Sequence, residues 1–176
     1  MLTNEILTAI SSRRSCRAYL PQQITAAELD AVTAAGTWAP TAMNYQSPTI
    51  VVVQDKATRD ELSALNARIM GTKADPFYGA PTVLLVLGDA QNRCTVQDGS
   101  LVLGNLMLAA SSLGLGSCWI NRARETFELP EGKALLQKWG FDPDKVVGIG
   151  YCILGYPAEG GIKAAAPRKA NYVVKV

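Results

Sequence analysis

The stretch Arg13-Arg14-Ser15-Cys16-Arg17 is where we expect the fold to be anchored, because it places three guanidinium groups within five residues. A planar guanidinium binds phosphate oxygens through two parallel hydrogen bonds, whereas a lysine offers only a point charge. Ser15 adds a hydroxyl and a backbone N–H to the same segment. We therefore predict that this segment binds an anion, most simply a phosphate. The alternative is a solvated basic turn whose arginines pair with surface carboxylates.

The composition is that of a globular protein. With 176 residues, 48% of them apolar, the chain can bury a sizeable core, and we expect residues 1–176 to form a single domain. The formal net charge of +2 is nearly balanced. A balanced charge gives no general attraction to nucleic acid, so we expect no nucleic-acid partner.

The sequence contains no histidine, which excludes several common kinds of catalytic site. Ser-His-Asp triads, Cys-His dyads and helical HExxH zinc sites all require an imidazole. The four cysteines form no CxxC pair, so we expect reduced thiols and no metal site. No signal-like leader and no apolar run of membrane-spanning length occurs. These features predict a cytoplasmic protein with no membrane partner.

Several helices are predicted from their N-terminal signals. Thr25 and Glu28 have the spacing of a capping box, and apolar residues follow at helical intervals. Thr3 is expected to cap a shorter helix that leads to the arginines. Two further helices are predicted to begin at Asp55 and at Pro130.

Strands are predicted where short apolar runs lie between turn signals. These runs are residues 49–54, 82–87, 114–120 and 146–154. The apolar tail segment 172–174 is expected to dock as an edge strand. Because helical and strand patterns interleave without a linker or repeat, we predict an α+β fold.

Residues 97–113 have the pattern of a helix that is apolar nearly all round. On a monomer, such a helix would leave one apolar flank exposed to water, which favours a subunit interface. Burial of the helix within the core of a single chain is the alternative.

Two connecting segments have the composition of functional loops. Residues 38–48 contain Pro40 and Pro48 together with the amide side chains of Asn44 and Gln46. Residues 71–81 form a long connection that we expect to be mobile, as a lid over a site would be.

Four motifs occur in a characteristic order: 13–19 (RRSCRAY), 39–46 (APTAMNYQ), 114–120 (GLGSCWI) and 154–157 (LGYP). With these motifs in order and a basic tail behind them, the sequence resembles the small FMN-dependent nitroreductase family. The resemblance extends from about residue 4 to Lys169. Thr41 departs from the family, which commonly has serine there. Ser47 separates Gln46 from Pro48, so we expect a different substrate-facing wall.

This resemblance implies a fold, an assembly and an activity. The fold would be an α+β sandwich with helices flanking a central mixed or antiparallel β-sheet. Two chains would form an intertwined homodimer with FMN at the interface. The enzyme would take hydride from NAD(P)H and reduce nitroaromatics, quinones or similar acceptors by a ping-pong mechanism. FMN would carry the chemistry, so no side chain is expected to be catalytic.

The resemblance also assigns three sets of FMN-binding residues. The first set would hold the phosphate and comprises Arg13, Arg14, Ser15 and Arg17, with Arg168 and Lys169 from the tail. The second set would flank the flavin ring and comprises Trp119 and Ile120. The third set would come from the partner subunit and comprises Pro40, Thr41, Ala42 and Asn44, with Gln46 nearby.

Two other functions remain compatible with the sequence. Cys16 lies between Arg14 and Arg17, whose charges would favour a thiolate, so it could be a nucleophile or a redox sensor. The chain could also bind or store FMN without turnover.

Overall fold

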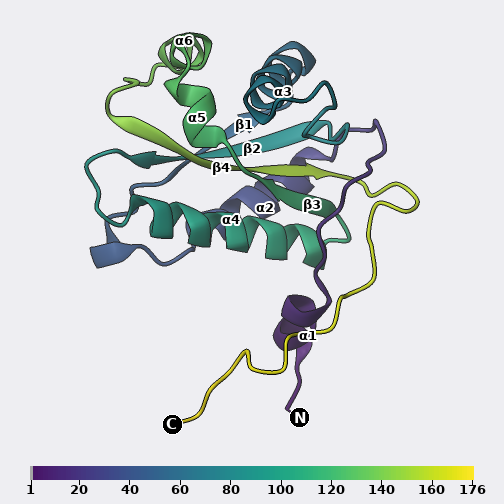
Figure 1. The fold of residues 1–176 in the computed structure, drawn as a ribbon. Coiled ribbons are helices and arrows are strands. Elements are labelled where there is room, and N and C mark those ends of the chain that lie inside the picture. The colour runs from purple at the N-terminus through teal and green to yellow at the C-terminus, as the bar shows by residue number, and fades with distance from the viewer. Residues whose placement is uncertain (1) are drawn as a thin grey trace.

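The computed structural model describes residues 2–176 and contains a four-stranded sheet between two layers of helices (Figure 1). The strands are β1 (Thr49–Val53), β2 (Thr82–Asp89), β3 (Gly116–Ile120) and β4 (Val146–Gly155), and they lie in the order β1-β2-β4-β3. Each neighbouring pair is antiparallel. The predicted α+β sandwich is therefore confirmed, with an antiparallel rather than a mixed sheet.

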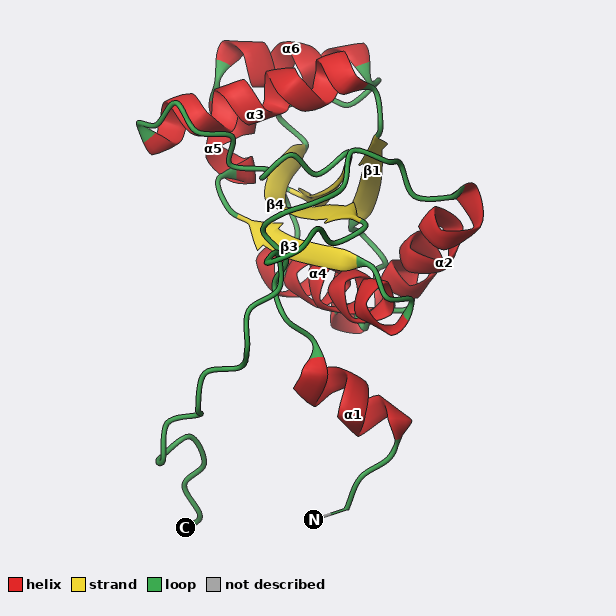
Figure 2. Ribbon diagram, turned by 90° about the vertical axis from the view of Figure 1, so that its right-hand side faces the viewer, coloured by secondary structure: helices red, strands yellow, loops and turns green. Residues whose placement is uncertain are grey.

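Helices cover both faces of this sheet (Figures 1 and 2). One layer contains α3 (Lys56–Met70), α5 (Ala123–Glu128) and α6 (Pro130–Lys138), and the other contains α2 (Ala26–Thr37) and α4 (Thr95–Ser112). α1 (Glu5–Ser12) lies outside both layers and buries none of its residues. Within residues 2–176, no helix combines the length and the apolar character that crossing a membrane would require.

The two central strands are apolar on both faces because each face is covered by helices. In β2, Val83, Leu85 and Leu87 face α3, α5 and α6, whereas Leu84 and Val86 face α2 and α4. All five side chains are at most 1% exposed. Burying one such side chain stabilises a fold by about 1.5–3 kcal/mol. This two-sided burial explains why residues 82–87 form an unbroken apolar run rather than an alternating one.

The helix caps mostly follow the sequence signals. The capping box of Thr25 and Glu28 forms at the start of α2, Asp55 caps α3, and Pro130 occupies the first turn of α6. The predicted cap of α1 at Thr3 is wrong. Asn4 caps this helix instead, because its side chain accepts a hydrogen bond from Leu7 N–H at 2.9 Å.

The arginine segment continues the sheet beyond β3. Cys16 N–H donates to Ser117 O at 2.9 Å, and Arg17 N–H donates to Gly161 O at 2.8 Å. Isolated bridges also join Ser15 to Ser117 and Cys16 to Ile162. The segment therefore lies between β3 and the chain that follows β4. Its arginines project from a backbone that is hydrogen-bonded on both sides.

The predicted edge strand at residues 172–174 does not form within this chain. Tyr172, Val173 and Val174 remain 71–75% exposed. The tail leaves the sheet after Ile162 and runs away from it on the side where α1 lies (Figures 1 and 2). Within the described residues 2–176, no strand pairs with this segment, and its apolar side chains stay exposed.

Candidate functional site

A cavity of about 200 Å³ opens at the end of β3. Arg17 from the arginine segment and Trp119 and Ile120 from β3 contribute to its lining. Tyr78, from the connection before β2, and Arg122, directly after β3, also line it. The structure therefore brings together one predicted phosphate ligand and both predicted ring-flanking residues.

Arg13 directs part of its guanidinium group into the protein. Its Nη1 atom is buried and has no hydrogen-bond partner within residues 2–176. Burial raises the pKa of the Cys152 thiol to about 12, Cys118 adds to that rise, and the positive charge of Arg13 opposes it. Arg13 therefore lies within electrostatic reach of β4. A buried N–H group without a partner costs about 1–3 kcal/mol, so an anion here would stabilise the site.

Two more unpartnered polar atoms lie on the same edge of the sheet. Ser117 Oγ and Trp119 Nε1 are both buried and make no hydrogen bond within residues 2–176. Ser117 and Trp119 are two positions apart in β3, and a β-bridge joins Ser117 to Ser15 of the arginine segment. Buried polar groups in folded proteins are nearly always hydrogen-bonded. Ser117 Oγ, on the residue bridged to the arginine segment, therefore fits an edge that binds a polar ligand, whereas Trp119 Nε1 lies over Gly150 of β4.

The other members of the arginine segment have distinct surroundings. Arg14 Nη1 donates to Ser11 O at 2.8 Å and to Arg13 O at 2.6 Å, so it is bound to the C-terminal end of α1. Arg17 is exposed beside the cavity. Among the described residues 2–176, none of the three arginines forms an ion pair with a carboxylate. The structure therefore does not support the alternative in which these arginines pair with surface acids.

Arg168 and Lys169 lie in the exposed tail. Lys169 Nζ stands 5.3 Å from the centre of the Tyr172 ring. Within residues 2–176, neither residue forms a hydrogen bond or an ion pair with the arginine segment. The structure therefore does not bring this part of the predicted phosphate set to the site.

The third predicted set lies at the opposite end of α4 from the arginine segment (Figure 1). Ala42 N–H donates to Asp98 in the first turn of α4, whereas Ser15 is bridged to Ser117 beyond its last turn. α4 has 18 residues, which corresponds to about 27 Å. The arginine segment and this loop of the same chain are therefore separated by about the length of α4.

The loop holding the third set includes the short 3-10 helix η1 (Ala42–Asn44). Thr41 Oγ1 accepts a hydrogen bond from Gln46 N–H at 3.0 Å, and Gln46 Nε2 donates to Asn44 Oδ1 at 3.2 Å. Thr41 and Ala42 are half-buried, whereas Pro40, Asn44 and Gln46 are exposed. The loop therefore presents its two amide side chains at the surface.

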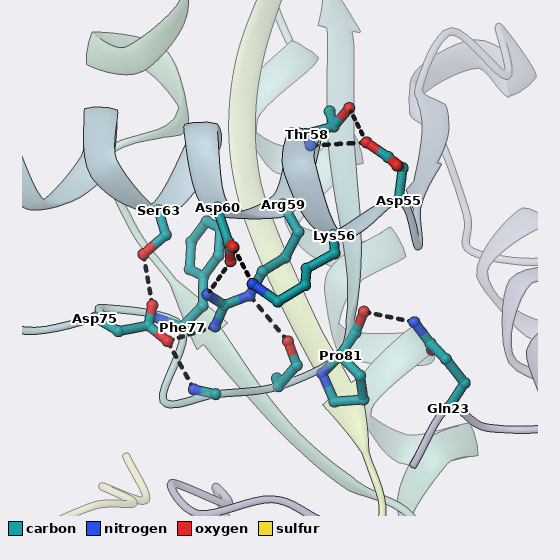
Figure 3. A network of polar contacts seen from close by, with 12 residues as sticks. Gln23, Asp55, Lys56, Thr58, Arg59, Asp60, Ser63, Asp75, Phe77 and Pro81 are labelled. Atoms are coloured by element: carbon teal, nitrogen blue, oxygen red, sulfur yellow. Dashed lines mark hydrogen bonds and ion pairs between the residues drawn. The ribbon is translucent and has the colours of Figure 1, made fainter. Parts of the chain in front are cut away.

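One wall of the cavity is fixed by Asp75 (Figure 3). Its Oδ1 accepts hydrogen bonds from Ser63 Oγ at 2.5 Å and Phe77 N–H at 2.8 Å. Its Oδ2 accepts one from Gly79 N–H at 2.7 Å and pairs with Arg59. These contacts tie residues 75–79 to α3. The connection that we expected to be a mobile lid is instead folded onto the protein.

Arg59 completes this arrangement from α3. Its Nε donates to Ala80 O at 3.1 Å, and its Nη1 donates to Asp60 Oδ1 at 3.1 Å (Figure 3). Burial alone would raise the pKa of Asp75, but hydrogen bonds from Ser63 and Arg59 and from two backbone N–H groups lower it below its ordinary value. The charged carboxylate is therefore the form that holds this wall.

The residues after β3 are fixed by a different buried side chain, Asn66. Its Nδ2 donates to Asn121 O at 2.8 Å, and its Oδ1 accepts a hydrogen bond from Arg122 Nε at 2.9 Å. Asn66 is fully buried. Arg122 has a positive φ of 72°, a conformation that costs about 1–2 kcal/mol for a residue other than glycine. The sequence analysis did not identify Arg122 or Tyr78, because neither belongs to a recognisable motif.

Cys16 is an unfavourable position for a reactive thiol. Its side chain is fully buried, and its Sγ donates to Ala18 O at 3.1 Å. A Cβ added at Gly116 would come within 2.7 Å of this sulfur atom, so Cys16 packs directly against β3. The residue therefore acts as a packing contact between the arginine segment and the sheet.

Fold and site together define an α+β protein with a basic, partly apolar cavity at the edge of an antiparallel sheet. Comparison with protein families identifies the class more closely. The model of the nitroreductase family matches residues 10–74 and 68–156. The chain belongs to the nitroreductase family, which confirms the resemblance.

Individual relatives cover most of the chain. A nitroreductase with bound FMN from Bacteroides fragilis is 32% identical, with a TM-score of 0.90, and the match covers 99% of this chain and 100% of that one. Two Bacillus subtilis proteins are each 28% identical. One, named FMN reductase [NAD(P)H], matches over 91% of this chain and 69% of its own length. The other, named FMN reductase (NADPH), matches over 96% and 73%.

The Asp75 wall predicts a specific dependence of stability on pH. The pKa of Asp75 is lowered in the folded state, so its hydrogen bonds and ion pair stabilise the fold above the unfolded-state pKa of about 3.9. This stabilisation is lost as the pH falls through the folded-state pKa. Asp75→Asn should lower the free energy of unfolding by about 2 kcal/mol at pH 7. It should also weaken the loss of stability below pH 4, as measured by urea titration over a pH series.

The matched control is Asp30→Asn, because Asp30 is exposed and its carboxylate makes no hydrogen bond or ion pair within residues 2–176. This variant should follow the wild-type curve. Superimposable pH dependence of wild type and Asp75→Asn would contradict the assignment of Asp75.

Proposed function

We propose that this chain is an NAD(P)H-dependent FMN oxidoreductase that reduces quinones, nitroaromatics or similar acceptors. The observation that carries the proposal is the buried, unpartnered Nη1 of Arg13 at the same edge of the sheet as the exposed guanidinium of Arg17. The FMN in the Bacteroides fragilis relative and the names of the Bacillus subtilis relatives support FMN and NAD(P)H as the cofactor and the electron donor.

The residues present fit the phosphate group of FMN. Arg13 and Arg17 provide guanidinium donors, and Ser15 adds a hydroxyl on the same hydrogen-bonded backbone. Arg14 supports the set by tying the segment to the end of α1. In the proposed assembly, the exposed tail contributes the further positive charges of Arg168 and Lys169.

The flavin ring would lie against Trp119 and Ile120 in the cavity beside β3. Its other protein contacts would come from a second chain, because Pro40, Thr41, Ala42, Asn44 and Gln46 lie a helix length away from the cavity. In this proposal each site is completed by the partner's loop. The active protein is therefore a homodimer with two composite sites.

An exposed apolar surface supports this assembly. A groove of about 580 Å³ between α1, α2 and α4 is lined by Ile6, Trp38 and Leu108, among others. Trp38 is 85% exposed and Ile6 is 66% exposed. Large exposed side chains gathered in one apolar groove are typical of protein–protein contacts. The groove includes the outer flank of α4, for which the sequence predicted a subunit contact.

When bound, FMN supplies the redox chemistry, accepting hydride from NAD(P)H and passing two electrons to an acceptor that also takes up protons. The chain positions the group and excludes water. Trp119 and Ile120 both contribute to the cavity lining, while the positive charges of Arg17 and Arg122 lie beside the same cavity, where they would stabilise developing negative charge. Because β3 covers one side of the cavity, donor and acceptor would bind in succession on the other.

The proposed function makes a prediction about FMN affinity. Arg13→Ala and Arg17→Ala should each weaken FMN binding by about 10- to 150-fold, because losing a charge-assisted hydrogen bond costs about 1.5–3 kcal/mol. Arg124→Ala is the control, since this exposed arginine of α5 pairs with Glu128. Fluorescence titration of the apoprotein with FMN measures the three affinities. The phosphate assignment fails if Arg13→Ala and Arg17→Ala both bind FMN like the control.

The proposed function also makes a prediction about turnover. With NAD(P)H and a quinone, double-reciprocal plots at several quinone concentrations should be parallel, because the two substrates use one side of the cavity in turn. Cys16→Ser should retain this activity, since a serine hydroxyl can also donate to Ala18 O but cannot perform thiolate chemistry.

Two outcomes would redirect this assignment. An FMN-loaded protein that oxidises no NADH or NADPH in the presence of a quinone would be a flavin-binding or storage protein. A Cys16→Ser variant that binds FMN normally but transfers no electrons would favour the reactive thiol.

A further inference from the structure

Asp98 is a buried carboxylate that the proposed function does not use. It is the only charged residue between Gln97 and Leu113, and it is only 2% exposed. It forms no ion pair within residues 2–176. Burying a charge without a cationic partner costs several kcal/mol unless hydrogen bonds compensate, so its contacts call for an explanation.

The contacts of Asp98 lead to the loop that the proposal places beside FMN. Asp98 Oδ1 accepts a hydrogen bond from Ala42 N–H at 2.9 Å, and Oδ2 accepts one from Asn92 Nδ2 at 3.0 Å. The same Asn92 Nδ2 donates its other hydrogen to Ser47 Oγ at 2.9 Å. Asn92 Oδ1 accepts from Cys94 N–H at 2.9 Å, which fixes the orientation of the amide. One carboxylate therefore holds Ala42 directly and Ser47 through Asn92.

The loop between these two attachment points is strained. Met43, Asn44 and Gln46 have positive φ angles of 52°, 56° and 50°. Asparagine adopts such a conformation readily, but for residues such as Met43 and Gln46 it costs about 1–3 kcal/mol and persists only where surrounding contacts enforce it. The loop also exposes large side chains, with Met43 82% and Tyr45 65% accessible. It is held in a conformation that its own sequence does not favour, with its side chains presented outward.

We propose that Asp98, acting directly and through Asn92, is a positioning residue that prepares residues 41–47 for contact with FMN in the partner's site. This inference rests on the proposed function. Asp98 does not contact the cofactor. It sets the backbone of the loop before the cofactor binds, so that little conformational entropy is lost on binding.

The chemistry at this point requires a carboxylate rather than an amide. Ala42 N–H and Asn92 Nδ2 are both donors, and an ionised carboxylate offers only acceptors. In Asp98→Asn, one of the two positions would present an NH₂ group to a donor. Turning Asn92 over would not relieve this conflict, because its Oδ1 is needed by Cys94 N–H.

The chain offers a matched rescue for this variant. In the double variant Asn92→Asp/Asp98→Asn, the new amide at position 98 can accept from Ala42 N–H and donate to the new carboxylate at position 92. That carboxylate can still accept from Cys94 N–H and can accept from the hydroxyl of Ser47. The exchange leaves the net charge and the composition unchanged.

The experiment measures two quantities for wild type, Asp98→Asn and the double variant. The first is the dissociation constant for FMN, from titration of the apoprotein. The second is hydrogen exchange of the backbone amides of residues 41–47 in the apoprotein. Asp98→Asn should weaken FMN binding at least about 10-fold and speed exchange in this loop. The double variant should restore both to within about threefold of wild type.

Several results would overturn the inference. It fails if Asp98→Asn binds FMN like wild type. It also fails if the double variant shows wild-type hydrogen exchange in residues 41–47 but binds FMN as weakly as Asp98→Asn. It also fails if faster exchange spreads evenly over the whole chain, because that marks a general loss of stability. A wild-type protein that binds no FMN would instead overturn the proposed function. The hydrogen-exchange comparison would still test whether Asp98 orders residues 41–47.

Discussion

The structure depends on the pairing of the arginine segment with the edge of the sheet. Cys16 N–H bonds to Ser117 O on one side, and Arg17 N–H bonds to Gly161 O on the other. The full burial of Cys16 against Gly116 closes this contact. A flexible basic terminus would lose much entropy on holding an anion. Here folding has already ordered the backbone from which Arg13 and Arg17 project, so this cost is met before a ligand binds.

The second constraint is the length of α4. The helix separates the arginine segment and its cavity from the loop of residues 41–47, and each end has its own support. Asp75 and Asn66 fix the walls of the cavity, whereas Asp98 fixes the loop. In both places the supporting side chains form hydrogen bonds with backbone groups. A chain that prepares two distant half-sites, and leaves an apolar groove exposed at Trp38, has the features of one partner in a composite site.

Sequence reasoning succeeded where the deciding interactions are local. Thr25 and Glu28 are three residues apart, and their capping box forms as predicted. The buried run at 82–87 indicated β2 because a strand covered on both faces needs no polar residue. The order of motifs was enough to indicate the family.

Sequence reasoning failed where contacts join distant parts of the chain. Asp98 and Ala42 are 56 positions apart, and Asn66 and Asn121 are 55 apart, so no spacing rule connects them. Asp98 is the single charged residue of α4, and that was an available signal. Residues 172–174 have the composition of a strand, but a strand also needs a neighbouring edge, and the part of the chain that the structure describes, residues 2–176, pairs none with them.

The most direct test of the composite site is a heterodimer made from two defective chains. One chain carries Arg17→Ala, and the other carries Asn44→Ala/Gln46→Ala; different tags allow the mixed dimer to be purified. If each site combines the arginine segment of one chain with the loop of the other, the heterodimer contains one intact site and one doubly defective site. We expect it to bind about half the FMN of the wild-type dimer with wild-type affinity, although both defective homodimers bind FMN weakly. A heterodimer with no wild-type site would show that each site is formed within a single chain, contrary to this account.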